Sequence, residues 1–240
     1  MAETGKRIVV IGASGGIGMA LCRRLSDKGD HVIGVSREPS DELQQVAAKV
    51  IRADAVSGDL SPLEPLAKEP VDGLVYCPGT ITLKPFRALK IEDFQRDLDI
   101  NLLGAVRTVQ ALLPGLRKSN EAAVVLFSTV ATRAGMNYHS SIAAAKAAVE
   151  GFAVSLAAEL SGQGIRVNVV APSLTDTPLA ERLLDTDTKK EASAKRHPLG
   201  RTGSAEDIAG AAEFLLSDTA TWITGQVISV DGGLSTLRPM

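Results

Sequence analysis

Residues 7–18 read RIVVIGASGGIG, a short β-branched run that leads into three spaced glycines, Gly12, Gly16 and Gly18. The run Ile8–Ile11 shows no polar alternation, which predicts a strand buried on both faces. Glycines at the turn allow a tight bend and a close approach of the backbone to a ligand. Where such a turn opens a helix, backbone N–H groups and the helix dipole can hold phosphate groups. We therefore predict a pyrophosphate-binding turn between the first strand and the first helix.

Further apolar runs and helical patterns alternate along the rest of the chain. The apolar runs lie at 31–35, 50–52, 71–76, 123–127, 166–170 and 227–230, and the helical patterns lie near 17–28, 41–48, 92–118, 140–161 and 205–217. This alternation is typical of parallel strands joined by right-handed crossovers. We expect an α/β fold, a doubly wound Rossmann-type sheet of seven parallel strands with helices on both faces. Ligands would then bind beyond the carboxyl ends of the strands.

Composition limits the classes of function. The chain has 240 residues with 45% hydrophobic content, which favours one domain over residues 1–240. With 26 basic and 28 acidic residues well mixed, we expect no nucleic-acid partner and no membrane partner. The two cysteines and three histidines show neither disulfide nor metal-ligand spacing, so no metal site and a cytoplasmic location are expected. The polar segment 178–201 interrupts the alternation and predicts a mobile lid over the site.

Further motifs follow the glycine turn in a fixed order. They are Asn101-Leu102-Leu103-Gly104, the helix that carries Lys146, Asn168-Val169-Val170-Ala171-Pro172, and the ending from Ile223-Thr224-Gly225-Gln226 through Val230-Asp231-Gly232-Gly233. In these motifs the whole chain resembles the short-chain dehydrogenase/reductase family, especially its compact members such as the 3-oxoacyl-carrier-protein reductases. The resemblance implies an NAD(P)-dependent enzyme with a small-molecule substrate, assembled as a homo-oligomer, either a dimer or a tetramer.

The resemblance also implies roles for individual residues. It places the pyrophosphate on Gly12 to Gly18, lined by Ser14 and Ile17, and the adenine at Asp54. Asn101 would hold a water next to Lys146, and Thr177 would bind the nicotinamide carboxamide. The expected cofactor contacts are completed by Ala55, Cys77, Gly79, Lys146 and Pro172. Three alternatives without a functional role remain open, in which Asp54 caps a loop, Asn101 is a structural helix residue and Lys146 is solvated.

The end of the second strand bears on the choice of cofactor. An enzyme that prefers NAD places an acidic residue there for the ribose hydroxyls, whereas NADP needs a cation near its 2′-phosphate. Here the strand ends Val35-Ser36-Arg37, a small hydroxyl followed by a guanidinium that can bind phosphate through two N–H groups. We therefore expect NADP, with NAD disfavoured. The alternative is a surface ion pair between Arg37 and Glu38 or Asp41.

One position departs from the family pattern. The family's acid is a tyrosine four residues before the lysine, and Ile142 stands at that position in this chain. A positioned proton donor contributes about 10²–10⁴ in rate, and an aliphatic side chain cannot donate. The serine expected thirteen positions earlier corresponds to Thr129, with Ser128 beside it, so a hydroxyl that could polarise a carbonyl is present.

Two other proton donors are conceivable. Tyr138 lies eight residues before Lys146 and could reach the nicotinamide, as tyrosines at larger spacing do in enoyl-thioester reductases. It could equally pack beneath the lid. Alternatively, Lys146 could donate through a water held by Asn101. The expected function is an oxidoreductase acting on a carbonyl, an alcohol or an enone, and the alternative is a catalytically silent NADP-binding sensor or structural subunit.

The helix predicted at about 141–160 indicates self-association. It is apolar over more of its surface than one sheet contact can cover. Its small residues Ala143, Ala144, Ala147 and Ala148 would allow the same helix of a second copy to approach closely.

Overall fold

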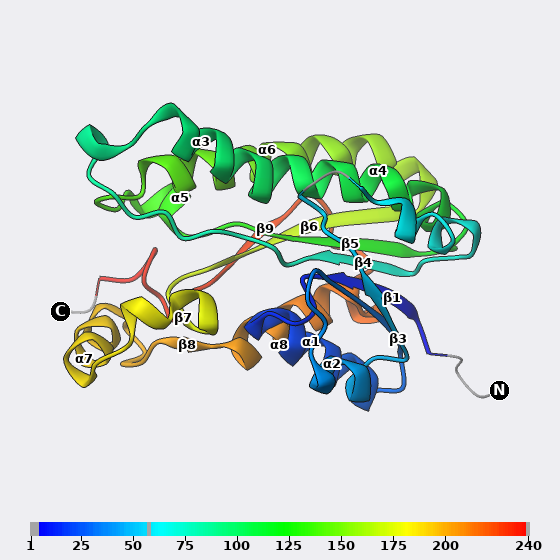
Figure 1. Cartoon of the computed structure of the whole chain (residues 1–240), viewed down its shortest axis with the longest axis horizontal. Coiled ribbons are helices and arrows are strands. Elements are labelled where there is room, and N and C mark those ends of the chain that lie inside the picture. The colour runs from blue at the N-terminus through cyan, green and yellow to red at the C-terminus, as the bar shows by residue number, and fades with distance from the viewer. Residues whose placement is uncertain (1–4, 57–58, 239–240) are drawn as a thin grey trace.

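A sheet of seven parallel strands forms the centre of the computed structural model, which describes residues 5–56 and 59–238 (Figure 1). The strands are β1 (Arg7–Ile11), β2 (His31–Ser36), β3 (Lys49–Arg52), β4 (Gly73–Tyr76), β5 (Ala122–Phe127), β6 (Ile165–Pro172) and β9 (Val227–Val230). Their order is β3-β2-β1-β4-β5-β6-β9, so the chain extends the sheet to one side of β1 as far as β3 and then to the other side from β4 onward. In sheets of this kind, ligands bind in the crevice beyond the carboxyl ends of the two strands at the switch, here β1 and β4. The expected doubly wound parallel sheet is confirmed.

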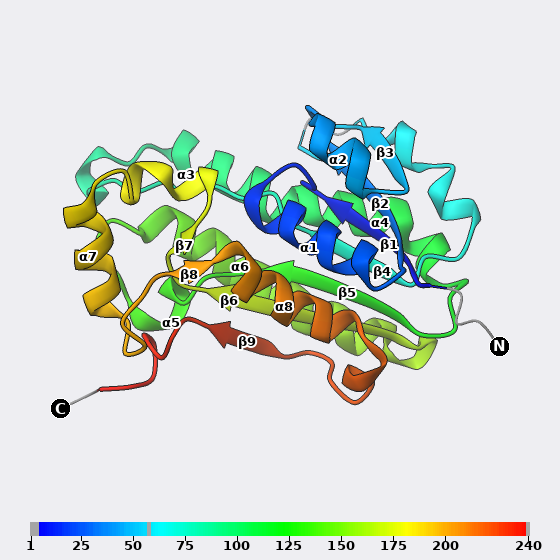
Figure 2. The same ribbon diagram turned by 90° about the horizontal axis from the view of Figure 1, so that it is seen from below.

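Helices cover both faces of the sheet (Figures 1 and 2). One face carries α1 (Gly16–Asp27), α2 (Asp41–Val46) and α8 (Ala205–Leu216), and the other carries α3 (Ile91–Leu98), α4 (Gly104–Leu116) and α6 (Ser140–Leu160). The short α5 (Ala131–Ala134) follows β5, and α7 (Asp187–Arg196) lies at the same end of the molecule. Short 3-10 helices span Ser61–Leu63, Leu66–Lys68, Phe86–Ala88, Ser161–Gln163, Pro178–Leu183 and Asp218–Ala220.

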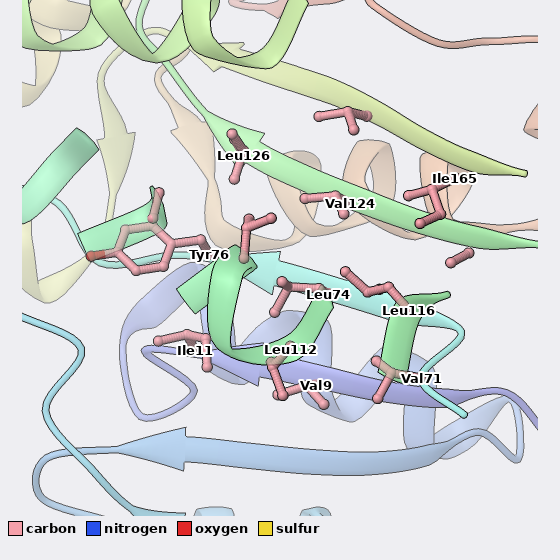
Figure 3. Packing of buried hydrophobic residues seen from close by; sticks show 14 of the residues in the cluster. Val9, Ile11, Val71, Leu74, Tyr76, Leu112, Leu116, Val124, Leu126 and Ile165 are labelled. Atoms are coloured by element: carbon pink, nitrogen blue, oxygen red, sulfur yellow. The ribbon is translucent and has the colours of Figure 1, made fainter. Parts of the chain in front are cut away.

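The strands are apolar on both sides because they separate two cores. Val9 and Ile11 of β1 pack in one core with Leu112 of α4 (Figure 3), whereas Ile8 and Val10 enter the core beneath α1 and α8. Full burial of such a side chain stabilises the fold by about 1.5–3 kcal/mol. This two-sided burial is why the first strand shows an unbroken apolar run rather than alternation.

The segment 92–118, expected as one helix, is interrupted. A π-helix at Asp99–Leu103 joins α3 to α4 and holds Asn101 at its centre. The hydroxyl of Tyr76 donates to the carbonyl of Ile100 at 2.7 Å, and any side chain on Gly104 would collide with that hydroxyl. The expectation of an uninterrupted helix was wrong, because a tertiary contact from β4 satisfies a carbonyl in the widened turn. Such turns occur frequently at functional sites.

The segment 178–201 contains structure that the sequence pattern did not reveal. It includes the 3-10 helix Pro178–Leu183 and α7, whose sequence DTKKEASAKR has no apolar stripe to signal a helix. Two short strands, β7 (Thr175–Asp176) and β8 (Gly203–Ser204), flank the segment and pair in parallel. Both ends of the expected lid are therefore tied together at the carboxyl end of the main sheet (Figure 2).

One helical stretch, Ser140–Gln163, is long and apolar enough to cross a membrane by length and composition alone. In this fold most of the stretch is α6, which packs against β5 and β6 on one face of the sheet. Its residues Ile142, Val149 and Leu160 are buried against the rest of the protein. The apolar residues of this helix therefore pack against the sheet in the present fold.

Candidate active site

The glycine turn has the shape that a phosphate group requires. Gly12 has φ +76°, a left-handed conformation that favours glycine, and its α-carbon faces the ring of Pro78 after β4. Any side chain on Gly18 would collide with the carbonyl oxygen of Gly12, so the first turn of α1 can pack directly on the bend. Both positions therefore require glycine for the bend and for the close packing of α1 on it.

Unpaired donors gather where this turn meets α1. The N–H groups of Gly16, Ile17 and Gly18 belong to the first helical turn, where no intrahelical acceptor exists. The Ser14 hydroxyl is buried and has no hydrogen-bond partner within the described residues. The first turn carries no acidic residue that would repel an anion. These residues therefore fit the pyrophosphate of a dinucleotide, which would supply the acceptors that the Ser14 hydroxyl and the helix lack.

The expected nicotinamide-binding residue lies against this turn. A side chain built on Gly16 would come within 2.9 Å of Thr177 and 3.1 Å of Pro178, so the start of the lid covers the first turn of α1. The lid itself borders an open cavity of about 590 Å³, which Thr177, Pro178 and Glu181 help to line. The structure thus brings the phosphate turn and the lid together, as the sequence led us to expect.

Two arginines meet at the carboxyl ends of β2 and β3. The Ser36 hydroxyl donates to the Glu38 carbonyl at 3.2 Å, and Arg37 is exposed. Arg52 is paired with Ser36 in the strand register, and its Nε donates to the Arg37 carbonyl at 3.1 Å. Among the ion pairs of residues 5–56 and 59–238, none involves Arg37, so the alternative surface pair is not formed. Sequence analysis did not single out Arg52.

The next cofactor positions follow β3. The Asp54 carboxylate accepts a hydrogen bond from the Val56 N–H at 2.9 Å, a turn contact that matches the loop-cap reading of this residue. Ala55 beside it is buried. The turn holds both residues just beyond the end of β3.

The loops after β4 and β5 are each bonded to the end of a neighbouring strand. Cys77 donates its N–H to the Ile11 carbonyl of β1 at 3.0 Å, and Val130 donates its N–H to the Pro172 carbonyl of β6 at 3.1 Å. Thr129 lies in the loop after β5 and is partly exposed, with its hydroxyl accepting from the Ala131 N–H at 3.3 Å. The Thr129 hydroxyl hydrogen is therefore available to a ligand oxygen.

Lys146 and Asn101 converge beneath Gly79. A methyl group on Gly79 would lie 3.5 Å from Lys146 Nζ and 3.3 Å from Asn101 Oδ1. Nζ donates to the Phe127 carbonyl at 2.9 Å, so the solvated reading of Lys146 is wrong: the side chain is 7% exposed. The Asn101 carboxamide oxygen is buried and has no partner in the described part of the chain.

Burial changes the proton affinity of this lysine. Loss of solvation lowers the pKa of Lys146 to about 8, while the nearby Asp97 carboxylate acts in the opposite direction. The amine can therefore both hold and release a proton close to neutral pH. A perturbed lysine in a crevice is typical of a functional site.

The other residues at positions considered for the proton donor or the polarising hydroxyl have different surroundings. Ser128 is buried against α6, where its hydroxyl donates to the Glu150 carboxylate at 2.5 Å and lies 3.4 Å from the Lys146 carbonyl. Ile142, one helical turn before Lys146, is 5% exposed. Tyr138 precedes α6 with φ 69°, and its side chain is 57% exposed rather than packed beneath the lid.

A polar cluster that sequence analysis missed adjoins Asn101. The Asn101 Nδ2 donates to the Thr80 hydroxyl at 2.9 Å, and that hydroxyl in turn donates to the Asp97 carboxylate at 2.6 Å. The only sequence signal was the spacing of Asp97 and Asn101, which are four residues apart and so share one helical face.

The chain is similar to several known proteins. A family model described as Enoyl-(Acyl carrier protein) reductase matches residues 12–235. The 3-oxoacyl-(acyl-carrier-protein) reductase FabG of Thermotoga maritima is 33% identical over 248 residues, covering 96% of this chain and 98% of the relative. A protein of Xanthobacter autotrophicus named Inactive 2-(S)-hydroxypropyl-CoM dehydrogenase 2 is 36% identical over 208 residues, covering 85% of each chain.

A solved structure agrees in fold over nearly the same length. It is a candidate NAD(P)-dependent gluconate 5-dehydrogenase from Beutenbergia cavernae with NADP bound at low occupancy. It superposes with a TM-score of 0.86 at 29% identity and covers 97% of both chains.

Proposed function

The chain belongs to the short-chain dehydrogenase/reductase family, and on that premise we propose an NADP-dependent oxidoreductase acting on a carbonyl, alcohol or enone substrate. Its proton donor would differ from the family's tyrosine. The observation that carries the proposal is the convergence of Lys146 Nζ and Asn101 Oδ1 beneath Gly79, at the carboxyl end of β4. A buried lysine with a pKa of about 8 can contact a cofactor and can also supply a proton, which a protein that only bound the cofactor would not require.

The residues of the crevice divide the chemistry between them. A bound nicotinamide would supply or accept the hydride at the substrate carbon. The Thr129 hydroxyl, whose oxygen already accepts from the Ala131 N–H, would donate a hydrogen bond to the substrate oxygen and so polarise it. The proton that this oxygen takes up during reduction would come from Lys146, directly or through a water that donates to Asn101 Oδ1.

The pKa of Lys146 suits this role. With a pKa of about 8, the amine is mostly protonated at neutral pH and can act as an acid. Reduction should therefore be fastest below pH 8 and slow as the pH rises through that value. Tyr138 is a weaker candidate, because its side chain is largely exposed. The contact from the Lys84 N–H holds the Tyr138 backbone carbonyl and does not hold the hydroxyl.

Charge at the ends of β2 and β3 supports NADP over NAD. Arg37 and Arg52 bring two guanidinium groups next to Ser36, and no acidic residue occupies that strand end to bind ribose hydroxyls. The NADP bound to the Beutenbergia cavernae protein supports the same choice for this fold. Members of the family act on small-molecule substrates, and we expect one for this protein.

One relative favours a second candidate function, in which the protein binds the cofactor without catalysis. The Xanthobacter autotrophicus protein is named inactive, and Ile142 removes the phenol expected in this family. The chain would then be a silent NADP-binding sensor or subunit. The buried, unpartnered oxygen of Asn101 argues for the enzyme, because leaving such a group unsatisfied costs about 1–3 kcal/mol.

Substrate screening with NADPH separates these functions. We expect NADPH oxidation with at least one member of a panel of ketones, β-ketoacyl thioesters, keto sugars and enones. Lys146→Ala should lower the rate by about 10²-fold or more, whereas Lys28→Ala, an exposed lysine at the end of α1, should not. Tyr138→Phe should leave the rate unchanged, and loss of activity in that variant would make Tyr138 the donor. NADPH binding without turnover in the parent or in Ile142→Tyr would establish the silent binder.

A further inference from the structure

Asp97 of α3 is a carboxylate with no exposed surface, and three hydroxyl groups surround it. Its Oδ1 accepts from Thr80 at 2.6 Å and from Thr82 at 2.8 Å, and its Oδ2 accepts from Ser141 at 2.7 Å. The contacts connect the loop after β4 to the first turn of α6. Asp97 therefore links the segments that carry Gly79 and Lys146.

Packing alone does not account for a carboxylate at this position. Burial of a charge is costly unless hydrogen bonds satisfy it, and an apolar residue of similar volume often stabilises a core as well or better. Here the short bonds from Thr80, Thr82 and Ser141 offset that cost. The cluster is therefore a built polar site within an otherwise apolar layer.

The direction of each hydrogen bond follows from the chemistry of the groups. A carboxylate only accepts, so Thr80 must give its single hydroxyl proton to Asp97. The Thr80 oxygen can then only accept, and it accepts from Asn101 Nδ2 at 2.9 Å. The second proton of Nδ2 goes to the backbone carbonyl of Asp97 at 2.8 Å.

Both protons of the Asn101 amide are thus bound by groups that Asp97 provides or controls. The carboxamide oxygen is left on the opposite side, where it borders the same point at Gly79 as Lys146 Nζ. We propose that Asp97 is a positioning residue, which fixes the carboxamide of Asn101 so that its oxygen faces the Lys146 ammonium and can accept from a water bound to it. The effect on turnover rests on the proposed function, but the arrangement is a property of the free protein.

The same carboxylate acts on the charge of Lys146. Two titratable groups lie near this amine on neighbouring elements, Cys77 after β4 and Asp97 of α3. Burial raises the pKa of the Cys77 thiol, which is therefore uncharged near pH 8, so the Asp97 carboxylate is the charge that raises the pKa of Lys146 against the effect of burial. Neutralising Asp97 should therefore lower the pKa of Lys146 below 8.

Lysine titration by NMR tests the electrostatic part without any assay of activity. In protein labelled at lysine 13Cε, with Lys146 assigned by comparison with Lys146→Arg, we expect Asp97→Asn to lower the Lys146 pKa measurably relative to the parent. Asp72→Asn is the matched control, because Asp72 also accepts from a hydroxyl, that of Ser119 at 2.6 Å, but lies at the start of β4. An unchanged Lys146 pKa in folded Asp97→Asn would overturn the electrostatic part.

A pair of threonine variants tests the positioning part and keeps the charge of Asp97. Thr80→Val removes the acceptor of Asn101 Nδ2, whereas Thr82→Val removes a hydroxyl that bonds only Asp97. We expect the Asn101 side-chain amide signals to shift and broaden in Thr80→Val alone, with turnover reduced by up to about 10²-fold. Equal spectra for the two variants would refute the positioning role. Shifted signals in a protein without turnover would support it and instead reject the proposed function.

Discussion

The phosphate turn and the first turn of α6 border the same crevice, but they hold their polar groups in opposite ways. At Gly12–Gly18 the donors are backbone N–H groups and a Ser14 hydroxyl that has no partner in the described structure. At the start of α6 the polar side chains are paired with one another, Ser141 with Asp97 and Lys146 with the Phe127 carbonyl. The first region is complete only with a ligand, whereas the second is organised before one arrives.

This difference indicates which of the two regions tolerates amino-acid substitution. The turn depends on its backbone conformation, so its function depends mainly on the glycines. The proton-handling region depends on side chains from β4, α3, the π-helix and α6, so one of its residues can change while the others keep their positions. Ile142 in place of a phenol is such a change.

The largest effect is expected from a side chain in the phosphate turn. Gly18→Ala would force a methyl group into the Gly12 carbonyl, so the turn must shift and cofactor binding should be abolished. Gly151→Ala is the control, since that helical glycine of α6 faces open space and alanine favours a helix by about 0.8–1 kcal/mol. Fluorescence titration with NADPH and thermal unfolding measure both. Normal binding by Gly18→Ala would show that the turn is not the phosphate site.

Restoring the phenol tests the second region. Ile142→Tyr places a hydroxyl one helical turn before Lys146, whose ammonium lowers the phenol pKa. Carbonyl reduction should rise by up to about 10²–10⁴-fold if the missing donor limits the rate. Ile142→Phe supplies the same ring without the hydroxyl and separates chemistry from packing. A similar rate in the Tyr and Phe variants would mean that the Lys146 route already suffices.

Cofactor choice should respond to charge at the end of β2. Arg37→Asp places a carboxylate beside the 2′-position, so NADPH affinity should fall about 10–100-fold and NADH affinity should rise. Arg52→Ala should weaken NADPH binding less and leave NADH binding unchanged, because Arg52 also donates to the Arg37 carbonyl. Comparison of the two dissociation constants for each variant measures the preference. Equal affinities of the parent for NADH and NADPH would contradict the expectation.

The smallest effect on activity is expected on the outer faces of the helices, where the two regions also differ. Arg23 and Arg24 of α1 form ion pairs, whereas the exposed stripe of α6 is apolar, comprising Ala144, Ala147, Gly151, Val154 and Ala158. We expect this stripe to pack on a second copy. Light scattering should give a mass well above 25.1 kDa, and Val154→Glu should reduce it. A parent monomer at micromolar concentration would disprove the association.

The sequence by itself determined the features that are local in the chain. The approximate strand positions, the glycine turn and the parallel, doubly wound class of the sheet follow from apolar periodicity and from residues close to one another, such as Ile8–Ile11 and Gly12. The charge of Arg37 at the end of β2 was likewise visible. These signals need no tertiary information, because backbone conformation and burial pattern fix them within a few residues.

Only the tertiary structure decided how the proton-handling side chains meet. Thr80 and Ser141 reach Asp97 across 17 and 44 residues of sequence, and Arg52 reaches Arg37 across 15. The break in the helix at Asn101 depends on the Tyr76 hydroxyl from another strand. The lid helix α7 has no apolar stripe to reveal it. Contacts of this kind arise from where strands and helices pack in space, and no periodicity along the chain encodes them.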